Sequence, residues 1–264
     1  MDTFHALTLA IIEGITEFLP VSSTAHMAIA SAFFHIEQDA YTKLFEVVIQ
    51  FGAILSVVVL YWKKFIDFRN PSFYAKLFIA ILPAIVIGGL LKTYIQGVLE
   101  NPLFIAFVLL GGGIILVFAD NWFKQSHITN EADITPKKAF LIGCYQVLAI
   151  IFPGLSRSAA TIIGGMQLKL TRSLAAEFSF FLAVPTMLAA TVKSLYDIWK
   201  EQPAMLGHEG ISYLLIGSGT AFIASLIAIK FFIQFLKQNG FKWFGIYRII
   251  VGSVLIVLIL TGKL

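Results

Sequence analysis

Two short stretches of this sequence place polar and charged side chains beside a proline in otherwise apolar surroundings. Residues 13–27 contain two glutamates, three consecutive hydroxyl residues and a histidine, namely Glu13, Glu17, Ser22, Ser23, Thr24 and His26. Residues 153–161 contain an arginine among hydroxyl residues, namely Ser156, Arg157, Ser158 and Thr161. Such groups bind phosphate and stabilise the charge that develops during phosphoryl transfer. The pattern therefore indicates phosphoryl chemistry if the fold brings both stretches together.

Arg157 follows Pro153 and Gly154 and precedes an apolar stretch, which predicts that it lies at the N-terminus of a helix. The free amides of a helix N-terminus, with hydroxyls and a guanidinium, form a binding site for phosphate. We therefore predict that Arg157 binds a diphosphate and stabilises transition-state charge. The hydroxyl residues predicted to assist it are Ser22, Thr24, Ser156, Ser158 and Thr161. For the serines and Thr24, service as helix N-caps is the structural alternative.

The two glutamates, Glu13 and Glu17, are one helical turn apart, so their carboxylates point the same way. Neighbouring carboxylates can share a divalent cation, a proton or an arginine. We predict that this pair holds a metal ion, Mg²⁺ or Ca²⁺. The structural alternative is that the pair only braces Arg157.

Either Ser23 or His26 is the candidate nucleophile, and the one that does not attack would act as its acid or base partner. An activated water is the third alternative. We favour Ser23 with His26 as its base. Ser23 follows Pro20 by three residues, as Ser156 follows Pro153, and His26 lies about one helical turn further on. A purely structural histidine is the alternative for His26.

The composition indicates that these residues belong to an integral membrane protein. Of 264 residues, 58% are hydrophobic and 13% charged, and the mean hydropathy is +0.87. The charged fraction is half of the ~25% typical of soluble domains. These values exclude a soluble globular domain, a disordered chain and a nucleic-acid-binding protein.

Six stretches are long and apolar enough to cross the hydrocarbon layer, which takes ~20 residues in a helix. The predicted spans are residues 42–62, 73–93, 102–123, 173–192, 211–236 and 243–261. The four tryptophans fall at or just beyond span ends, as in an aromatic belt. They are Trp62, Trp122, Trp199 and Trp243.

The two polar stretches interrupt apolar segments that are too short to be ordinary spans. Residues 3–19 and 25–36 flank the first stretch, and residues 139–152 and 159–168 flank the second. Proline and glycine interrupt the hydrogen bonds of a helix and leave backbone groups unpaired. Hydrocarbon cannot satisfy these groups, so each interruption must be buried in protein. We therefore predict two re-entrant helical hairpins, with two broken full spans per region as the alternative.

The hairpin regions resemble each other in the spacing of their prolines and serines. Residues 1–131 and 132–264 are thus two predicted repeats of one membrane domain, each a hairpin followed by three transmembrane helices. Three crossings is an odd number, so the second repeat is inverted relative to the first. Inverted repeats with broken helices place binding sites at the repeat interface near mid-membrane.

The lysines and arginines concentrate on one side of the predicted spans, as illustrated by Lys63, Lys64, Arg69, Lys137 and Lys138. The positive-inside rule assigns that side to the cytoplasm and both termini to the outer side.

Four further charged residues fall in or near the predicted spans. Glu46 and Glu177 are expected near span ends at the interface rather than in the site. Lys230 is expected to reach the interface with its long side chain, and Arg248 to do the same or to pair with an acid.

Two motifs identify a family resemblance. EGITEFLPVSSTAHM at residues 13–27 and PGLSRSAAT at residues 153–161 strongly resemble the signature motifs of bacterial undecaprenyl-diphosphatase, an integral membrane enzyme known from bacitracin resistance. QFGAILSVV from Gln50 and EFSFFLAVPTML from Glu177 extend the likeness to nearly the whole chain. Ala25 and Ala159 depart from the pattern, since many members have glycine there.

The resemblance implies hydrolysis of undecaprenyl diphosphate to undecaprenyl phosphate and inorganic phosphate. This reaction would recycle the lipid carrier for peptidoglycan and cell-wall synthesis in the bacterial plasma (inner) membrane. The resemblance also implies a divalent cation and a site that opens toward the periplasm. The family's acidic motif corresponds to Glu13 and Glu17, its histidine to His26, and its second motif to Pro153, Gly154, Ser156, Arg157, Ser158 and Thr161.

A secondary transporter or lipid flippase is the rival interpretation, because inverted repeats and broken helices are also typical of transporters. In that case Glu13 and Glu17 would carry protons or sodium, and Arg157 would hold an anionic substrate. The concentration of hydroxyls with a histidine favours the enzyme. The oligomeric state is open, and a homodimer is compatible with the sequence.

Overall fold

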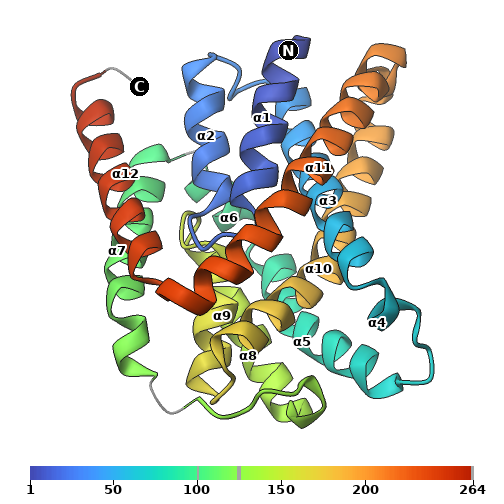
Figure 1. The fold of residues 1–264 in the computed structure, drawn as a ribbon. Helices are drawn as coiled ribbons and strands as arrows, with labels where there is room; N and C mark the ends of the chain where they lie inside the picture. The colour runs from blue at the N-terminus through green and yellow to red at the C-terminus, as the bar shows by residue number, and fades with distance from the viewer. Residues whose placement is uncertain (100, 124–125, 263–264) are drawn as a thin grey trace.

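The computed structural model describes residues 1–99, 101–123 and 126–262. Almost all of this part of the chain is helical, which confirms the all-α prediction (Figure 1). The helices are α1 (Thr3–Thr16), α2 (Ser23–Phe33), α3 (Ala40–Leu60), α4 (Trp62–Ile66), α5 (Pro71–Leu90), α6 (Lys92–Leu99), α7 (Pro102–Trp122), α8 (Pro136–Ile151), α9 (Arg157–Gln167), α10 (Arg172–Glu201), α11 (His208–Asn239) and α12 (Lys242–Leu260), with short 3₁₀ turns at Glu131–Asp133 and Pro203–Leu206.

Six of these helices, α3, α5, α7, α10, α11 and α12, are long and apolar enough to cross a membrane. They coincide with the six predicted spans. With 30 and 32 residues, α10 and α11 extend beyond the predicted ranges 173–192 and 211–236. The additional turns are polar; in α10, Lys193 pairs with Asp197 at 2.5 Å, one turn later. Pairs of this kind support a helix outside an apolar stretch, where hydropathy alone does not detect it.

The other helices at membrane depth form two short hairpins, α1 with α2 and α8 with α9. These helices have 14, 11, 16 and 11 residues, and even the longest is only about 24 Å at 1.5 Å per residue. The hydrocarbon layer is ~30 Å thick, so the lengths favour re-entrant hairpins over pairs of full spans. Figure 1 shows the first hairpin entering from the end where α1 begins and α12 ends, and the second entering from the opposite end. Their tips meet in the middle of the molecule.

The two hairpin tips have the same local structure. Ser22 and Ser156 are the N-caps of α2 and α9, and each has a positive φ, of 72° and 75°. Each serine Oγ accepts a hydrogen bond from the amide three residues later, at 3.3 Å from Ala25 and 3.2 Å from Ala159. Gly154 also has a positive φ, of 97°, in a turn where glycine avoids the strain of a Cβ.

This geometry corrects one step of the sequence argument. Ser22, rather than Ser23, occupies the position that Ser156 holds in the other tip. Ser23 therefore corresponds to Arg157 as the first residue of its helix, and its hydroxyl is free for contacts outside the cap. Counting three residues from each proline gave the wrong match, because the N-cap serine follows Pro20 by two residues and Pro153 by three.

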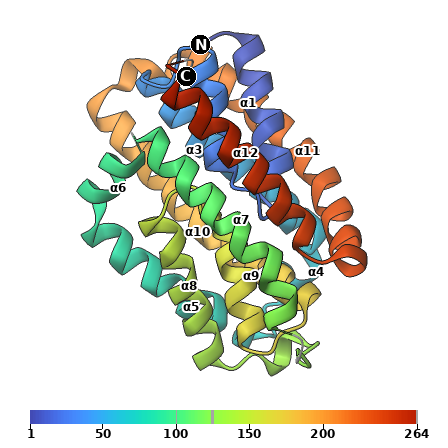
Figure 2. The same ribbon diagram turned by 90° about the vertical axis from the view of Figure 1, so that its left-hand side faces the viewer.

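The order of elements is the same in both halves of the chain, a hairpin followed by three long helices. Each hairpin packs on a long helix of the other half: α1 lies against α11, and α8 lies against α5. A hydrogen bond of 2.9 Å from Ser225 Oγ to the Gly14 carbonyl ties α11 to α1. The helices α7 and α12 run side by side (Figure 2). The inverted relation of residues 1–131 and 132–264 stays a prediction.

Candidate functional site

The two hairpin tips are joined by an ion pair between residues that the sequence singled out. Glu17 is the C-cap of α1, and Arg157 is the first residue of α9. Arg157 Nη2 lies 2.5 Å from Glu17 Oε1, and both side chains are largely buried. Ser23, at the start of α2, donates a hydrogen bond of 2.6 Å to the other carboxylate oxygen, Glu17 Oε2. One carboxylate therefore connects a hydroxyl with a guanidinium.

A second contact orients the Arg157 guanidinium. Its Nη1 donates a hydrogen bond of 3.0 Å to the Ser179 carbonyl in α10. Its Nε is buried and has no hydrogen-bond partner among the described residues. The guanidinium is therefore held on two sides, with donor capacity left for a ligand.

The predicted phosphate-binding hydroxyls surround this pair in different ways. Ser156 Oγ and Ser158 Oγ lie 2.9 Å apart, and Ser158 also donates to the Leu19 carbonyl at 3.0 Å, which ties the second tip to the first. Thr161 is fully buried one turn behind Arg157, whose carbonyl it hydrogen-bonds at 2.9 Å.

Ser22 is buried as an N-cap, and Thr24 is half-buried in the first turn of α2. For all these hydroxyls, contact with a diphosphate stays a prediction.

Glu13 is fully buried, and neither of its carboxylate oxygens has a hydrogen-bond partner in the described part of the chain. The charged groups that act on it are Glu17, Glu46 and Arg157. Glu46 lies in the second turn of α3, where Ser31 Oγ donates to it at 2.5 Å, and its expected place near a span end stays a prediction. A buried carboxylate without partners is costly, which makes Glu13 the clearest candidate in this site for a cation ligand.

His26 does not contact Ser23 as the sequence led us to expect. Its Nδ1 lies 2.8 Å from the Ser22 carbonyl, and its Nε2 lies 2.7 Å from the Tyr247 hydroxyl. A carbonyl only accepts, so Nδ1 carries the proton and Nε2 accepts from Tyr247. The two rings are also stacked, with centroids 5.6 Å apart. The hydrogen-bond partner of the Ser23 hydroxyl is therefore Glu17, and both ring nitrogens of His26 are engaged elsewhere.

The sequence analysis did not single out Tyr247. Its contact with His26 leads to a prediction about turnover. Tyr247→Phe removes one hydrogen bond, whose net worth of about 0.5–1.5 kcal/mol corresponds to a loss of roughly tenfold or less in turnover. His26→Ala removes the whole imidazole, the second acid or base candidate beside Glu17, and is expected to cost roughly 10²–10⁴ in turnover. Steady-state kinetics on both variants check this order, which equal losses would contradict.

Arg248 is the second missed residue. It is fully buried in α12, and its guanidinium donates to backbone carbonyls of both hairpin tips and of α7. The expectations that it extends to the interface or pairs with an acid are both wrong. No sequence spacing signals this contact, because the residues are far apart in the chain.

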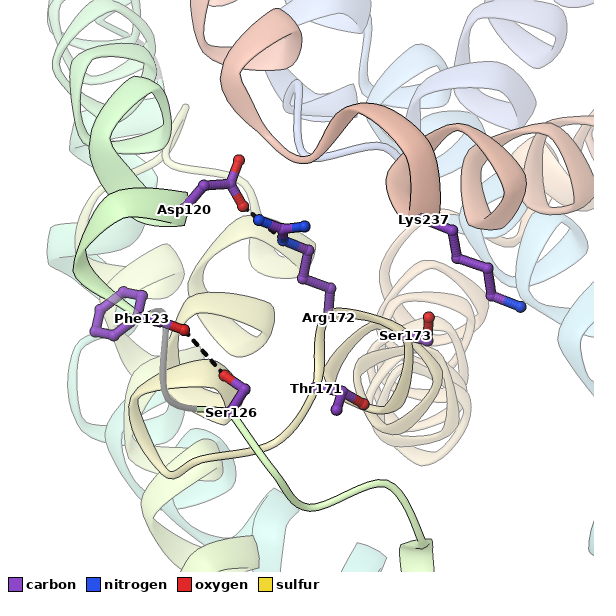
Figure 3. Close-up of a pocket in the computed structure, with 7 residues that line it drawn as sticks. All are labelled: Asp120, Phe123, Ser126, Thr171, Arg172, Ser173 and Lys237. Carbon is purple, nitrogen blue, oxygen red and sulfur yellow. Dashed lines mark hydrogen bonds and ion pairs between the residues drawn. The ribbon is translucent and has the colours of Figure 1, made fainter.

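A cavity of about 430 Å³ lies apart from these tips, between the ends of α7, α10 and α11 (Figure 3). Arg172 and Asp120 form an ion pair of 2.7 Å in its wall. Its lining residues are Asp120, Phe123, Ser126, Thr171, Arg172, Ser173 and Lys237. None of the predicted site residues lines it, so the candidate site remains the junction of the two tips.

Comparison with known proteins shows the family of the chain. A family model described as bacitracin resistance protein BacA matches residues 6–254. An undecaprenyl-diphosphatase of Flavobacterium johnsoniae is 55% identical over 259 residues, which is 98% of this chain and 96% of the relative. Undecaprenyl-diphosphatases of Porphyromonas gingivalis and Aquifex aeolicus are 49% and 43% identical, over 99% and 96% of this chain and 98% and 97% of their own lengths. The chain therefore belongs to the bacitracin resistance protein BacA family of multi-pass membrane proteins.

Proposed function

We propose that this protein is an undecaprenyl-diphosphatase, which hydrolyses undecaprenyl diphosphate to undecaprenyl phosphate and inorganic phosphate. The reaction recycles the lipid carrier for cell-wall synthesis and thereby confers bacitracin resistance. The observation that carries the proposal is the contact of Ser23 with Glu17 and of Glu17 with Arg157 across the two tips. The family and the names of its members support it. The rival interpretation, a transporter or flippase, is not favoured.

The contacts support a mechanism in which Ser23 is the nucleophile. Ser23 Oγ would attack the terminal phosphorus while Glu17 takes the hydroxyl proton. The new Oγ–P bond replaces the phosphoanhydride P–O bond, and undecaprenyl phosphate leaves. Water then hydrolyses the phosphoserine to release inorganic phosphate. Arg157 would hold the phosphate oxygens and stabilise the charge that develops on them.

The carboxylates of Glu13 and Glu17 fit a divalent cation. Both oxygens of Glu13 are buried without hydrogen-bond partners among the described residues, and Mg²⁺ is commonly held by one or two carboxylates together with substrate phosphates and water. Within the described residues, no cluster of three or more acidic, histidine or cysteine side chains forms a closed metal site. When bound, such a cation would reduce the repulsion between the diphosphate and the carboxylates. Mg²⁺ and Ca²⁺ are both proposed.

Release of inorganic phosphate from undecaprenyl diphosphate by purified protein tests the proposed activity. We expect phosphate release with Mg²⁺ or Ca²⁺, loss of release with a chelator, and recovery when the cation is restored. A matched sample without protein controls for spontaneous hydrolysis. Absence of phosphate with every divalent cation tested would refute the proposed activity and revive the transporter interpretation.

Glu13→Gln tests the cation site. The carboxylate of Glu13 has no hydrogen-bond partner among the described residues, so this change removes a proposed ligand without breaking an ion pair. We expect the cation concentration for half-maximal activity to rise at least about tenfold. With chelator present, the melting temperature should not fall, because the carboxyl group of Glu13 makes no hydrogen bond among the described residues that the amide would lose.

Glu201→Gln, at the exposed end of α10, is the matched control and should change neither quantity. If Glu13→Gln instead melts earlier while its cation dependence stays the same, Glu13 braces the hairpins and does not bind metal.

We further propose that the tip junction opens toward the outer, periplasmic side of the plasma membrane, with both termini on that side. The beginning of α1 and the end of α12 lie at one end of the molecule (Figures 1 and 2). Segments rich in lysine and arginine, such as α4 with Lys63 and Lys64 and the first turn of α8 with Lys137 and Lys138, belong to the opposite end, which supports its assignment to the cytoplasm (Figure 1). The homodimer stays a prediction.

A further inference from the structure

Arg248 is a fully buried cation whose partners, within the described chain, are carbonyls rather than carboxylates. Its Nε donates to the Leu109 carbonyl of α7 at 3.2 Å. Its Nη1 donates to the Pro20 carbonyl of the first tip at 3.1 Å and to the Leu155 carbonyl of the second at 2.7 Å. Its Nη2 donates to the Gly154 carbonyl of the second tip at 2.9 Å. One planar guanidinium therefore holds both tips.

The breaks between the hairpin helices leave these carbonyls in need of donors. Pro20, Gly154 and Leu155 lie in the turns outside α1, α2, α8 and α9. In the membrane interior, water does not satisfy such groups, and an unsatisfied carbonyl there is strongly destabilising. Arg248 supplies donors to both turns from a helix that belongs to neither hairpin. Because its fork is rigid, the two tips cannot shift relative to each other without breaking hydrogen bonds.

The close packing of α7 on α12 lets the guanidinium reach the tips (Figure 2). A Cβ added at Gly112 of α7 would lie 3.0 Å from Cζ of Arg248 and 3.2 Å from Cδ1 of Leu155. The absence of a side chain at Gly112 thus provides the space that the guanidinium occupies. At the neighbouring Gly111, an added Cβ would meet nothing within 4 Å.

The surroundings of the Arg248 guanidinium differ from those of the Arg157 guanidinium. Arg157 is paired with the Glu17 carboxylate, whereas the partners of Arg248 among the described residues are carbonyl oxygens of the tips and of α7. A buried charge acts strongly in a medium of low dielectric constant. The Arg248 guanidinium therefore favours the binding of an anion at the junction of the tips.

We propose that Arg248 is a positioning residue for the phosphatase reaction, which fixes the first tip, with Ser23 and Glu17, against the second tip, with Arg157. The inference rests on the proposed function. It predicts that disturbing Arg248 lowers kcat far more than it raises KM, because the lipid tail of the substrate still binds while the reacting groups are misaligned.

Three variants test this role. Arg248→Lys keeps the charge but loses the fork, and we expect kcat to fall at least about 100-fold, as a small misplacement of reacting groups can cause. Gly112→Ala keeps Arg248 but displaces its guanidinium, and we expect a loss of about tenfold or more by the same mechanism. Gly111→Ala, the matched control on the same helix, should keep kcat within about twofold of the wild type, since surface changes away from such features have small effects.

Two further measurements separate positioning from a loss of folding. In Arg248→Ala, added guanidinium ion should restore part of kcat. Hydrogen exchange at residues 19–23 and 153–157 should speed up in Arg248→Ala and not in Gly111→Ala, with the melting temperature in detergent recorded for each. The inference is overturned if both tips exchange as in the wild type, or if kcat falls only in step with melting temperature and guanidinium restores nothing. Because exchange is independent of turnover, an inactive wild type would refute the proposed function and still leave the positioning role open to support or refutation.

Discussion

Arg157→Lys is expected to lower kcat for phosphate release by at least about 100-fold, the usual effect of removing one donor that stabilises transition-state charge. The Arg157 guanidinium reaches Glu17 and the Ser179 carbonyl at the same time, through Nη2 and Nη1, and its Nε remains available. A lysine ammonium has no planar fork and cannot hold these partners and two phosphate oxygens together. Steady-state kinetics on the purified variant measure the loss.

Arg172→Lys provides the matched control. Arg172 forms an ion pair of 2.7 Å with Asp120 and is partly exposed in the wall of the separate cavity. The same replacement there should leave kcat within about twofold of the wild type, because exposed ion pairs contribute little. Near-wild-type turnover of Arg157→Lys would contradict its assignment as the principal phosphate ligand.

Ser23→Ala is expected to abolish turnover, because it removes the oxygen that forms the bond to phosphorus. Among the described residues, the Ser23 hydroxyl is the one that hydrogen-bonds the Glu17 carboxylate, at 2.6 Å, and no other hydroxyl there takes its place. Quenching the wild-type reaction in acid with labelled substrate should trap a phosphoserine at Ser23. Ser212→Ala, a change of a half-buried serine near the start of α11, is the control and should leave turnover and labelling unchanged.

The quench also tests the two alternatives for the nucleophile. Phosphohistidine is acid-labile and survives base, so a label found only after a base quench, and lost in His26→Ala, would show that His26 attacks. No labelled protein in either quench would favour an activated water. Turnover of Ser23→Ala close to that of the wild type would rule out Ser23 directly.

The membrane helices could be predicted closely from the sequence. The length of an apolar run can be compared directly with the thickness of the hydrocarbon layer, and both are local quantities. Proline, glycine and serine in the two interruptions likewise predicted the hairpin turns, because their effect on the backbone is local. The extra turns of α10 and α11 were missed since they are polar helix, held by contacts such as Lys193 with Asp197.

The types of residue at the junction were predictable, but their partners were not. The sequence argument joined Ser23 to His26 because they are one turn apart, whereas the structure joins Ser23 to Glu17 and His26 to Tyr247. Helical spacing shows which side chains share a face. It does not show which third element faces them, and α12 is the element that brings Tyr247 to His26.

An all-helical membrane protein with two polar, interrupted segments could be inferred from the amino-acid sequence, together with the side chains that could act on a phosphate. These properties follow from apolar run lengths and from residues that act within one turn of chain. The packing of the helices establishes that Glu17 and Arg157, 140 residues apart, form an ion pair, and that Arg248 holds both tips. Such contacts depend on how long helices pack across the membrane, and a buried arginine bound to carbonyls has no acidic partner in the sequence that would reveal it.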